Sequence, residues 1–470
     1  MSLTLCVKEG NNKVNAGPIA LPENVSKTAD LLADAGGEAY VVGGAVRDLL
    51  LGKVPGDFDL ATNLAPQEVQ KRFPFSVPTG IDHGTVTVWL NPRGEGPGME
   101  ITTYRGEGGY SDGRHPDRVF FVSRIEDDLA RRDFTVNAMA LSPRDGRLVD
   151  PFGGQADLKA GILRAVGDPL VRFREDGLRA MRAVRFAATL EFMIDPPTFA
   201  AISQTLDVTA RVASERLRDE LLKMLTAPKP STGFALMRDS GLLALVLPEL
   251  LEGVGMTQNH HHAYSVYDHV MACVDAAAGR TARLGALFHD IAKPRTRAPK
   301  ESAPGEFSFF KHEHVGADLT DEVMRRLRFS NEEREKVAGL VRNHMFWYDS
   351  TWSPGTVRRF VRRVGEDNLQ DLYALRRADI AGRGRSEDPA TELAALETRV
   401  AQVLAESRAL KVTDLVINGD DVMRAAARGG GRYVRETLEA LLERVMEDPA
   451  LNTREALLAA LPELLATKSG

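Results

Sequence analysis

The sequence contains two aspartates separated by one residue, Asp57 and Asp59, and this pair restricts the possible folds more than any other feature. Residues 57–61 have the pattern of a short strand, on which alternate side chains face the same side. Both carboxylates then point to one face and form an oxygen site suited to Mg²⁺. Two such ions can activate an attacking oxygen and stabilise a leaving one in phosphoryl or nucleotidyl transfer. An isolated Asp-x-Asp pair usually lies at a solvated strand end. The neighbouring residues therefore decide whether this pair is expected to bind metal.

The residues before the aspartates supply those surroundings. Residues 38–42 are mostly apolar and predict a short buried strand, which Gly43 and Gly44 end. Residues 45–51 predict a helix that carries Arg47. Glycines let a backbone approach a ligand closely, and a helix N-terminus attracts phosphate. A strand, a glycine pair, a helix with an arginine and an Asp-x-Asp strand together indicate a metal-dependent site for a phosphate-bearing substrate.

The periodicity of the remaining sequence predicts how the chain is organised. Helical and strand patterns alternate at first, with a helix at 25–35 and strands at 84–90 and 99–104, which predicts an α/β fold. From Asp157 to the end the periodicity is mostly helical. At roughly 100–200 residues per domain, a chain of 470 residues suggests about three domains. Proline- and glycine-rich stretches mark two candidate boundaries and an exposed loop, at residues 226–230, 382–389 and 295–307 respectively.

Composition and charge exclude several classes of protein. Hydrophobic residues make up 43% of the chain and charged residues 27%, as in ordinary globular proteins. The net charge of −6 argues against a globally basic nucleic-acid coat, although local clusters can still bind RNA. The two cysteines, Cys6 and Cys273, are far apart and form no disulfide framework. The start of the chain lacks a signal-peptide pattern, and no apolar run approaches the ~18 residues of a membrane span, so we expect a cytoplasmic protein.

Five stretches of the sequence resemble the ordered motifs of one known family. Residues 43–62, GGAVRDLLLGKVPGDFDLAT, resemble motif A of the class II tRNA nucleotidyltransferase and bacterial poly(A) polymerase family, in the polymerase-β superfamily. Motifs B to E are matched in order by DLARRDFTVNAMAL (128–141), LVDPFGGQADL (148–158), FREDGLRAMRAVRFAA (173–188) and ASERLRDELLKML (213–225). The glycine-rich segment 105–119 resembles the family's flexible loop between motifs A and B. Five motifs in the family's order make coincidence implausible.

The resemblance implies a fold and a division of the chain. The expected fold is an α/β polymerase-β-type nucleotidyltransferase head, followed by an all-α neck, an HD-type body and a helical tail. The expected parts are an N-terminal extension (1–22), the head (23–155), a neck that binds nucleotide and RNA (156–228), an HD-type helical domain (229–385) and a helical C-terminal tail that binds tRNA (386–470).

The resemblance also implies roles for residues of the head. The family places its Mg²⁺ ions on the two aspartates of motif A, here Asp57 and Asp59, as the catalytic residues. Superfamily members often add a third carboxylate, for which Glu100 and Asp133 are both candidates; Asp133 could instead pair with an arginine. Contacts to the phosphates or sugar of a nucleotide are implied at Gly43, Gly44, Arg47, Arg132, Asn137, Arg182 and Arg185.

Motif D contains Asp176 and Arg179, which the family uses as a protein template for the incoming base. A carboxylate only accepts hydrogen bonds and a guanidinium only donates them. Cytosine and adenine each offer an exocyclic amine beside a ring acceptor, whereas uracil and guanine present the opposite pattern. An Asp176/Arg179 reader would therefore accept C and A and leave polar groups unpaired against U and G.

Histidines and aspartates gather in the middle of the chain. Most of its ten histidines lie between residues 260 and 344, a clustering that core packing does not explain. Mixtures of histidine and carboxylate suit Ni²⁺, Mn²⁺, Zn²⁺ or Fe. The region resembles an HD-type metal-dependent phosphohydrolase domain, whose ligands would be His269, His289, Asp290 and Asp379. His312 and His344 could serve a second metal or bind phosphate, and the alternative is a retained fold without activity.

The leading interpretation is an enzyme that adds CCA to tRNA 3′ ends from CTP and ATP, with tRNA, ATP and CTP as partners and no membrane. A CC-adding or A-adding enzyme and a poly(A) polymerase share these motifs, and an HD-domain phosphohydrolase is the alternative from another class. A pure RNA-binding module needs no such carboxylates. Basic clusters at 325–328 and 358–363 could contact phosphates or be solvated helix faces. The sequence leaves open whether the protein is a monomer or a homodimer.

Overall fold

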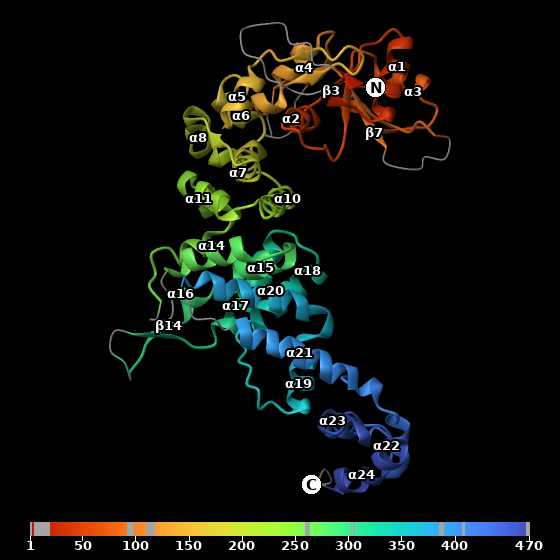
Figure 1. The fold of residues 1–470 in the computed structure, drawn as a ribbon, viewed down its shortest axis with the longest axis vertical. Coiled ribbons are helices and arrows are strands. Elements are labelled where there is room, and N and C mark those ends of the chain that lie inside the picture. Colours follow the sequence, from red (N-terminus) through yellow and green to blue (C-terminus); the bar gives the residue numbers. More distant parts are fainter. Residues whose placement is uncertain are drawn as a thin grey trace. The chain divides into compact units, whose positions relative to one another are not determined.

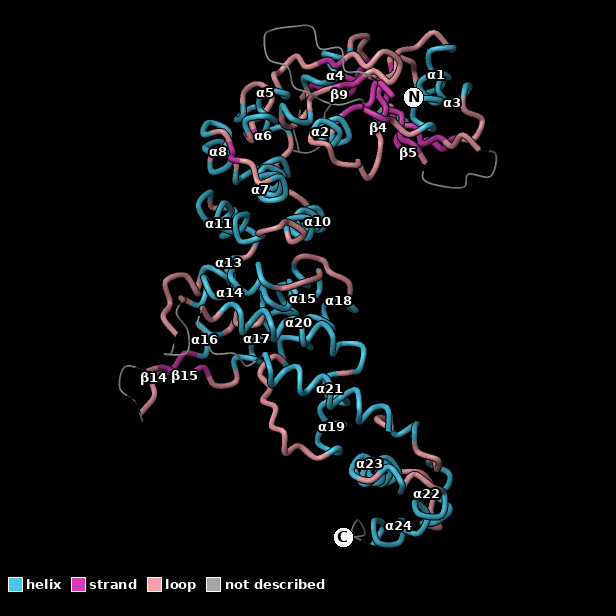
Figure 2. Tube along the Cα trace, in the orientation of Figure 1, coloured by secondary structure: helices cyan, strands magenta, loops and turns pink. Residues whose placement is uncertain are grey.

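The computed structural model describes residues 2–3, 19–91, 98–109, 118–258, 264–301, 303, 306–384, 390–406 and 409–466. The chain divides into two compact units, Met1–Val246 and Leu247–Gly470. The first unit holds a mixed sheet and helices, and the second is helical apart from one short hairpin (Figures 1 and 2). The expected fold, an α/β head followed by helical parts, is confirmed.

A seven-stranded sheet forms the centre of the head, with the strand order β11-β10-β3-β4-β7-β6-β5. β4 and β7 are parallel, and the other neighbouring pairs are antiparallel. Its strands are β3 (Tyr40–Val42), β4 (Asp59–Thr62), β5 (Ser76–Gly80), β6 (Thr85–Val88), β7 (Met99–Thr103), β10 (Ala140–Leu141) and β11 (Leu148–Val149). These short strands carry β-branched or aromatic residues at many inward positions, as half-buried sheets require.

The register of the central strands sets the position of the acidic pair. Val42, the last residue of β3, pairs with Asp59, the first residue of β4. The chain turns away after Val42 because Gly43 has a φ of 70°, so Asp57 has no strand partner opposite it. The strand predicted from residue 57 therefore begins at Asp59 instead, and the glycine pair lies at the same edge of the sheet as the aspartates.

Helices cover the sheet and connect its strands. The core on one face joins Tyr40, Val42 and Ala61 of the sheet to Ile125 and Leu129 of α4. The head helices are α1 (Glu23–Asp34), α2 (Gly44–Leu50), α3 (Pro66–Arg72) and α4 (Ile125–Ala130), with the 3₁₀ turns η1 (Ile81–His83) and η2 (Thr135–Asn137). Helices were predicted at 25–35 and 45–51, so the first two predictions are correct to within two residues.

Two short strand pairs accompany the head. β1 (Ser2–Leu3) pairs with β2 (Ile19–Ala20), and β8 (Arg105–Gly108) pairs with β9 (Arg118–Phe121). The loop predicted at 105–119 is therefore wrong at its two ends, which form an antiparallel ladder. The backbone groups of these ends hydrogen-bond to each other rather than to water. Residues 110–117 lie outside the described residues.

The neck helices complete the first unit. α10 and α11 both pack against α7, the helix of motif D. The α6 helix starts at an N-cap, Asp168, which accepts a hydrogen bond from the Leu170 amide at 2.8 Å. The elements are α5 (Gly154–Ala160), β12 (Ile162–Leu163), α6 (Pro169–Glu175), α7 (Leu178–Leu190), β13 (Met193–Ile194), α8 (Pro196–Ser203), α9 (Leu206–Thr209), α10 (Ser214–Met224), α11 (Pro230–Ser240) and α12 (Leu242–Val246).

The second unit begins with a bundle in which α14 packs against α15 and α20, and α17 packs against α18. The exposed loop predicted at 295–307 is wrong in part, because β14 pairs with β15 there as a hairpin. The elements are α13 (Pro248–Leu251), α14 (Val266–Ala276), α15 (Arg280–Phe288), α16 (Lys293–Thr296), β14 (Arg297–Pro299), β15 (Phe307–Phe309), α17 (His312–Arg326), α18 (Asn331–Asn343), α19 (Pro354–Val364), η3 (Glu366–Asn368), α20 (Leu369–Gly382) and α21 (Ala390–Glu406).

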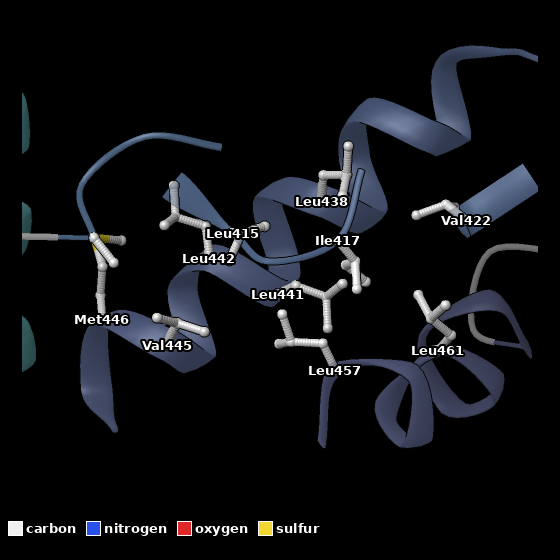
Figure 3. Close-up of a cluster of buried hydrophobic side chains, with 11 residues drawn as sticks. Leu415, Ile417, Val422, Leu438, Leu441, Leu442, Val445, Met446, Leu457 and Leu461 are labelled. Atoms are coloured by element: carbon white, nitrogen blue, oxygen red, sulfur yellow. The ribbon is translucent and has the colours of Figure 1, made fainter. Parts of the chain in front are cut away.

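A small helical bundle ends the chain. Leu441, Leu442 and Leu457 lie in its apolar core, which Figure 3 shows between the helices. Arg358 of α19 is fully buried and donates a hydrogen bond to the Met446 carbonyl at 2.8 Å, so it is no RNA contact. The elements are η4 (Val412–Asp414), α22 (Gly419–Ala426), α23 (Arg432–Glu447), η5 (Pro449–Leu451) and α24 (Arg454–Ala466). In the described part of the chain no helix is long and apolar enough to cross a membrane.

Candidate functional site

A cavity of about 630 Å³ in the first unit brings the motif residues together. Its volume is within the roughly 300–1,000 Å³ of typical ligand pockets. Every nucleotide contact expected from the sequence lines it except Gly43, which is the N-cap of α2 beside it. The lining residues are Gly44, Ala45, Arg47, Asp57, Asp59, Arg131, Arg132, Asp133, Asn137, Asp176, Leu178, Arg179, Arg182, Arg185, Phe186, Arg216 and Lys223.

The acidic pair lies between this cavity and a second one of about 350 Å³, which Glu100 also lines. Desolvation by the surrounding protein, and then the negative charges of Asp57 and Glu100, raise the pKa of Asp59 to about 6. The three carboxylates repel one another when all of them are ionised. A divalent cation would relieve this repulsion, and the all-oxygen donor set fits Mg²⁺.

The other candidate for a third carboxylate, Asp133, is already paired. Its Oδ1 accepts hydrogen bonds from the Phe134 amide at 2.8 Å and from Asn137 at 3.1 Å. Its Oδ2 accepts one from Arg182 Nε at 2.8 Å. Burial opposes ionisation, but Arg182 and Asn137 together hold the pKa of Asp133 at about 2. Asp133 therefore orients an arginine and an asparagine of the cavity, whereas Glu100 lies beside the acidic pair.

The glycine turn fits closely against a cavity arginine. A Cβ atom on Gly43 would lie 2.9 Å from Arg132 Nη1, and the positive φ of Gly43 also favours glycine. Arg47 Nη1 donates a hydrogen bond to Asn137 Oδ1 at 2.8 Å, and Arg47 Nε donates one to Asp48 Oδ1 at 2.9 Å. These bonds fix Arg47 and Asn137, which are distant in the sequence, side by side at the edge of the cavity.

Three arginines of the cavity surround the ring of Phe186. The guanidinium carbon of Arg185 lies 3.5 Å from the ring centroid, and those of Arg47 and Arg182 lie 5.2 and 5.3 Å from it. Such cation–π contacts hold cationic side chains at fixed positions. Arg185 Nε also donates a hydrogen bond to Glu220 Oε2 at 2.7 Å. Neither Phe186 nor Glu220 was predicted from the sequence as part of this site.

Asp176 and Arg179 are held by different partners in the described part of the chain. Asp176 accepts two hydrogen bonds from Arg216, at 2.9 and 3.3 Å. Arg179 pairs with Glu175 and donates hydrogen bonds to the backbone carbonyls of Arg131 and Arg172, at 3.0 and 2.8 Å. Neither Arg216 nor Glu175 was predicted from the sequence as part of the site. Both lie within the motif stretches, but only the packing of α10 against α7 reveals that Arg216 reaches Asp176.

A second candidate site lies in the second unit, where His269 of α14, His289 and Asp290 after α15, and Asp379 of α20 converge. His269 Nε2 lies 3.2 Å from His289 Nε2 and 3.3 Å from Asp379 Oδ1. All four side chains are buried. The structure therefore brings together the four metal ligands expected from the sequence. The neighbouring histidines at 260–262 lie outside the described residues.

The histidines of this site share one orientation. Each Nδ1 lies within hydrogen-bond distance of a backbone carbonyl: His269 and Gly382 at 3.0 Å, His289 and Ala286 at 2.8 Å, His312 and Phe309 at 2.8 Å, and His344 and Val341 at 2.6 Å. A neutral ring that donates through Nδ1 carries its lone pair on Nε2. The Nε2 atoms of His312 and His344 are only 3.3 Å apart. Lone pairs that face each other at such distances suit a bound cation.

Asp290 lies between the two histidine pairs. Its Oδ2 is 3.2 Å from His289 Nε2, and its Oδ1 is 3.4 Å from His312 Nε2 and 3.8 Å from His344 Nε2. Lys293 Nζ lies 2.6 Å from Oδ2. One carboxylate thus faces two sets of nitrogen ligands, an arrangement that can hold two metal ions.

Three family models match the chain. Residues 39–164 match the poly(A) polymerase head domain. Residues 191–253 match a probable RNA- and SrmB-binding site of polymerase A, and residues 260–414 match the HD domain. The acidic pair Asp57 and Asp59 thus lies in the segment that matches the head domain, and the histidine site lies in the segment that matches the HD domain.

Some curated relatives match nearly the whole chain, and others match only about half of it. A CCA-adding enzyme of Geobacillus kaustophilus is 35% identical over 431 residues, which cover 91% of this chain and 93% of that protein. One from Geobacillus stearothermophilus is 32% identical and covers 93% and 96%. The CCA-adding enzyme of Lactobacillus johnsonii is 46% identical over 225 residues, and the match spans only 55% of its length.

Solved structures resemble the whole chain. The Bacillus stearothermophilus CCA-adding enzyme in complex with CTP superposes with a TM-score of 0.71 at 27% identity, over 94% of this chain and 97% of that one. A Thermotoga maritima CCA-adding enzyme complexed with tRNA has a TM-score of 0.54 at 21% identity, over 96% of each chain, and shares the fold.

Proposed function

This chain belongs to the family of CCA-adding enzymes, which are nucleotidyltransferases, and from that premise we propose that it adds CCA to tRNA 3′ ends from CTP and ATP without a nucleic-acid template. The observation that carries the proposal is the single cavity in which the acidic pair Asp57 and Asp59 meets Asp176 and Arg179. Carboxylates for metal ions and a reader for a base are needed together only where a nucleotide is both selected and transferred.

We assign the parts of the chain accordingly. The head (23–155) carries the chemistry, the neck (156–228) selects the nucleotide, and the HD-type body (229–385) and the tail (386–470) follow, with an extension at 1–22. The tail would bind tRNA by recognising the shape of the tRNA rather than its base sequence. A cytoplasmic location fits the sequence, in which two distant cysteines form no disulfide framework.

Asp57 and Asp59 are the proposed catalytic ligands of Mg²⁺, with Glu100 as the third carboxylate. When bound there, Mg²⁺ would polarise the attacking hydroxyl and offset the charge of the triphosphate. In the reaction, a bond forms between the tRNA 3′ oxygen and the α-phosphorus, the bond from that phosphorus to pyrophosphate breaks, and the hydroxyl proton passes to solvent. The chain's own contribution is to hold these groups in line, since positioning and charge stabilisation dominate such transfers.

The arginines around Phe186 are the proposed triphosphate contacts. Arg182 and Arg185 are held by Asp133 and Glu220, and both cations reach the cavity. A guanidinium whose position is fixed before binding loses little entropy when it contacts a phosphate. Arg47 and Arg132 extend this positive surface toward the glycine turn, where Gly43 and Gly44 allow close approach, and Asn137 contacts the sugar.

One assay tests the main proposal. We expect tRNA that ends at the discriminator base to gain two cytidines with CTP alone, nothing with ATP alone, and CCA with both. The added nucleotides are read by gel electrophoresis and sequencing of the 3′ end. Failure to add any nucleotide would refute the proposal. A product that stops after CC, a product made only from tRNA ending in CC, or a long A tail would identify the partial enzymes or a poly(A) polymerase instead.

The histidine site supports a second candidate function, a metal-dependent phosphohydrolase. The observation that favours it is the position of Asp290 between two histidine pairs. His269, His289, Asp290 and Asp379 would hold one transition-metal ion, such as Ni²⁺, Mn²⁺, Zn²⁺ or Fe. His312 and His344 would hold a second ion with Asp290 shared between the two. Two such ions suit the hydrolysis of a phosphoester.

Substitution of His289 tests this second function. We expect His289→Ala to lower metal-stimulated hydrolysis of bis(p-nitrophenyl) phosphate at least about 100-fold, because a metal ligand is lost. The absorbance of released p-nitrophenol measures the rate. His314→Ala is the matched control, since His314 is exposed and is not one of the proposed metal ligands. Hydrolysis that survives His289→Ala would contradict the ligand assignment.

A further inference from the structure

A buried carboxylate, that of Asp128, lies next to two arginines of the nucleotide cavity. Asp128 is only 1% exposed and belongs to α4. Arg131 and Arg132 follow it by three and four residues, a spacing that brings side chains to one side of a helix end. Both arginines line the cavity, although only Arg132 was expected there from the sequence. One buried carboxylate therefore pairs with two cations of the cavity.

The two oxygens of Asp128 are divided between these arginines. Oδ1 accepts hydrogen bonds from Arg131 Nη2 at 2.8 Å and from Arg131 Nε at 3.1 Å. Oδ2 accepts one from Arg132 Nη2 at 3.2 Å. The amide of Arg105, the first residue of β8, also donates to Oδ1 at 3.3 Å. Although burial disfavours the ionised form, the charges of Arg131 and Arg132 lower the pKa of Asp128. Asp128 is thus a charged group with one oxygen directed at each arginine.

The two arginines lie beside different parts of the site. A Cβ atom on Gly43 would lie 2.9 Å from Arg132 Nη1, so Arg132 packs against the glycine turn. The Arg131 carbonyl accepts a hydrogen bond from Arg179 Nη2 at 3.0 Å, so Arg131 adjoins the proposed base reader. The side chains of Arg131 and Arg132 are 18% and 21% exposed, which means that they are mostly enclosed but open to the cavity. Asp128 therefore supports the cavity wall between the glycine turn and the base reader.

We propose that Asp128 is a positioning residue of the nucleotide site, which holds Arg131 and Arg132 in place for the triphosphate. This inference rests on the proposed function and names a residue behind the site that sets its affinity for nucleotides. An arginine side chain has many rotamers, and a guanidinium that is held before the ligand arrives loses less entropy on binding. Asp128 is not among the described residues that line the cavity, so it acts through the arginines rather than on the nucleotide itself.

Asp128→Asn tests this role, because asparagine keeps the size of the side chain but has one acceptor oxygen and an amino group that only donates. One arginine then loses its partner. We expect the Kd for CTP with Mg²⁺, measured by calorimetry on the full chain, to rise at least about tenfold, since hydrogen bonds between charged groups contribute that much. The Kd for tRNA that ends at the discriminator base should stay nearly unchanged. Asp127→Asn is the matched control, because Asp127 is the exposed neighbour on the same helix, and it should alter neither constant.

Two further variants test whether Asp128 acts through the arginines. In a protein that carries Arg131→Ala and Arg132→Ala, adding Asp128→Asn should raise the Kd for CTP less than about twofold, because residues that act as one unit are not additive. Asp128→Glu keeps the charge, so it leaves neither arginine without an ionic partner. It moves the carboxylate by one methylene, and we expect the Kd for CTP to rise at least about threefold because the arginines shift with it. This variant provides the test even where Asp128→Asn does not fold.

The outcomes separate this inference from the proposal on which it rests. Unchanged CTP affinity in folded Asp128→Asn or Asp128→Glu protein would overturn the positioning role and leave the proposed function intact. An equal loss of CTP and tRNA affinity would also overturn it, because it would indicate a general structural defect. A full effect of Asp128→Asn in the protein that lacks both arginines would show that Asp128 does not act through them. No CTP binding by the unsubstituted protein would contradict the proposed function itself and the inference with it.

Discussion

Asp57→Asn is expected to lower the rate of nucleotide addition at least ~10³-fold, which corresponds to about 4 kcal/mol of transition-state stabilisation. The substitution keeps the size of the side chain and removes one of the charges that would hold Mg²⁺ beside the triphosphate. Asp57 lines both cavities of the head, so it lies where the two carboxylates can share ions. Single-turnover addition of CMP to tRNA measures the rate.

The control for this substitution is Asp34→Asn. Asp34 ends α1, is exposed, and pairs with Arg72 at 3.3 Å, so the same chemical change there should leave addition nearly unchanged. Asp59→Asn should match Asp57→Asn, because both carboxylates are proposed ligands. If Asp57→Asn adds CMP at the rate of the unsubstituted protein, the metal assignment is wrong.

The acidic pair could be predicted from the sequence because its signal is local. The strand, the glycine turn, the helix and the second strand follow one another within residues 38–62, and short-range patterns specify such elements well. The predicted start of the second strand at Asp57 was wrong by two residues. Strand ends depend on the partner strand, and β3 ends at Val42, opposite Asp59.

The partners of the cavity residues could not be predicted in the same way. Arg216 reaches Asp176 across 40 residues of sequence, and Arg182 reaches Asp133 across 49. No periodicity encodes such pairs, because they depend on how α7 packs against its neighbours. The choice between Glu100 and Asp133 likewise needed the ion pair of Asp133, which the sequence analysis could only offer as an alternative.

The histidine site could be predicted from the sequence only in part. A family resemblance predicted that His269, His289, Asp290 and Asp379 converge, and the structure brings them together.

Asp176→Ala is expected to lower the preference for CTP over UTP at least ~10²-fold, or about 2.7 kcal/mol. In the proposed function this carboxylate accepts from the exocyclic amine of the base, so its loss should remove the penalty that rejects uracil. Competition between the two triphosphates on tRNA, read by sequencing the 3′ end, measures the ratio. Asp219→Ala is the matched control, because Asp219 lies on α10 and pairs with Arg218.

Arg216→Lys and Arg216→Ala then distinguish recognition from positioning. Arg216 holds Asp176 through two hydrogen bonds, a geometry that lysine cannot reproduce even though it keeps the charge. If Arg216 positions the reader, both substitutions should relax the CTP preference, and alanine should do so more than lysine. Combining Arg216→Ala with Asp176→Ala should add little, since residues that act as one unit are not additive. A CTP preference retained in Asp176→Ala would mean that another part of the cavity reads the base.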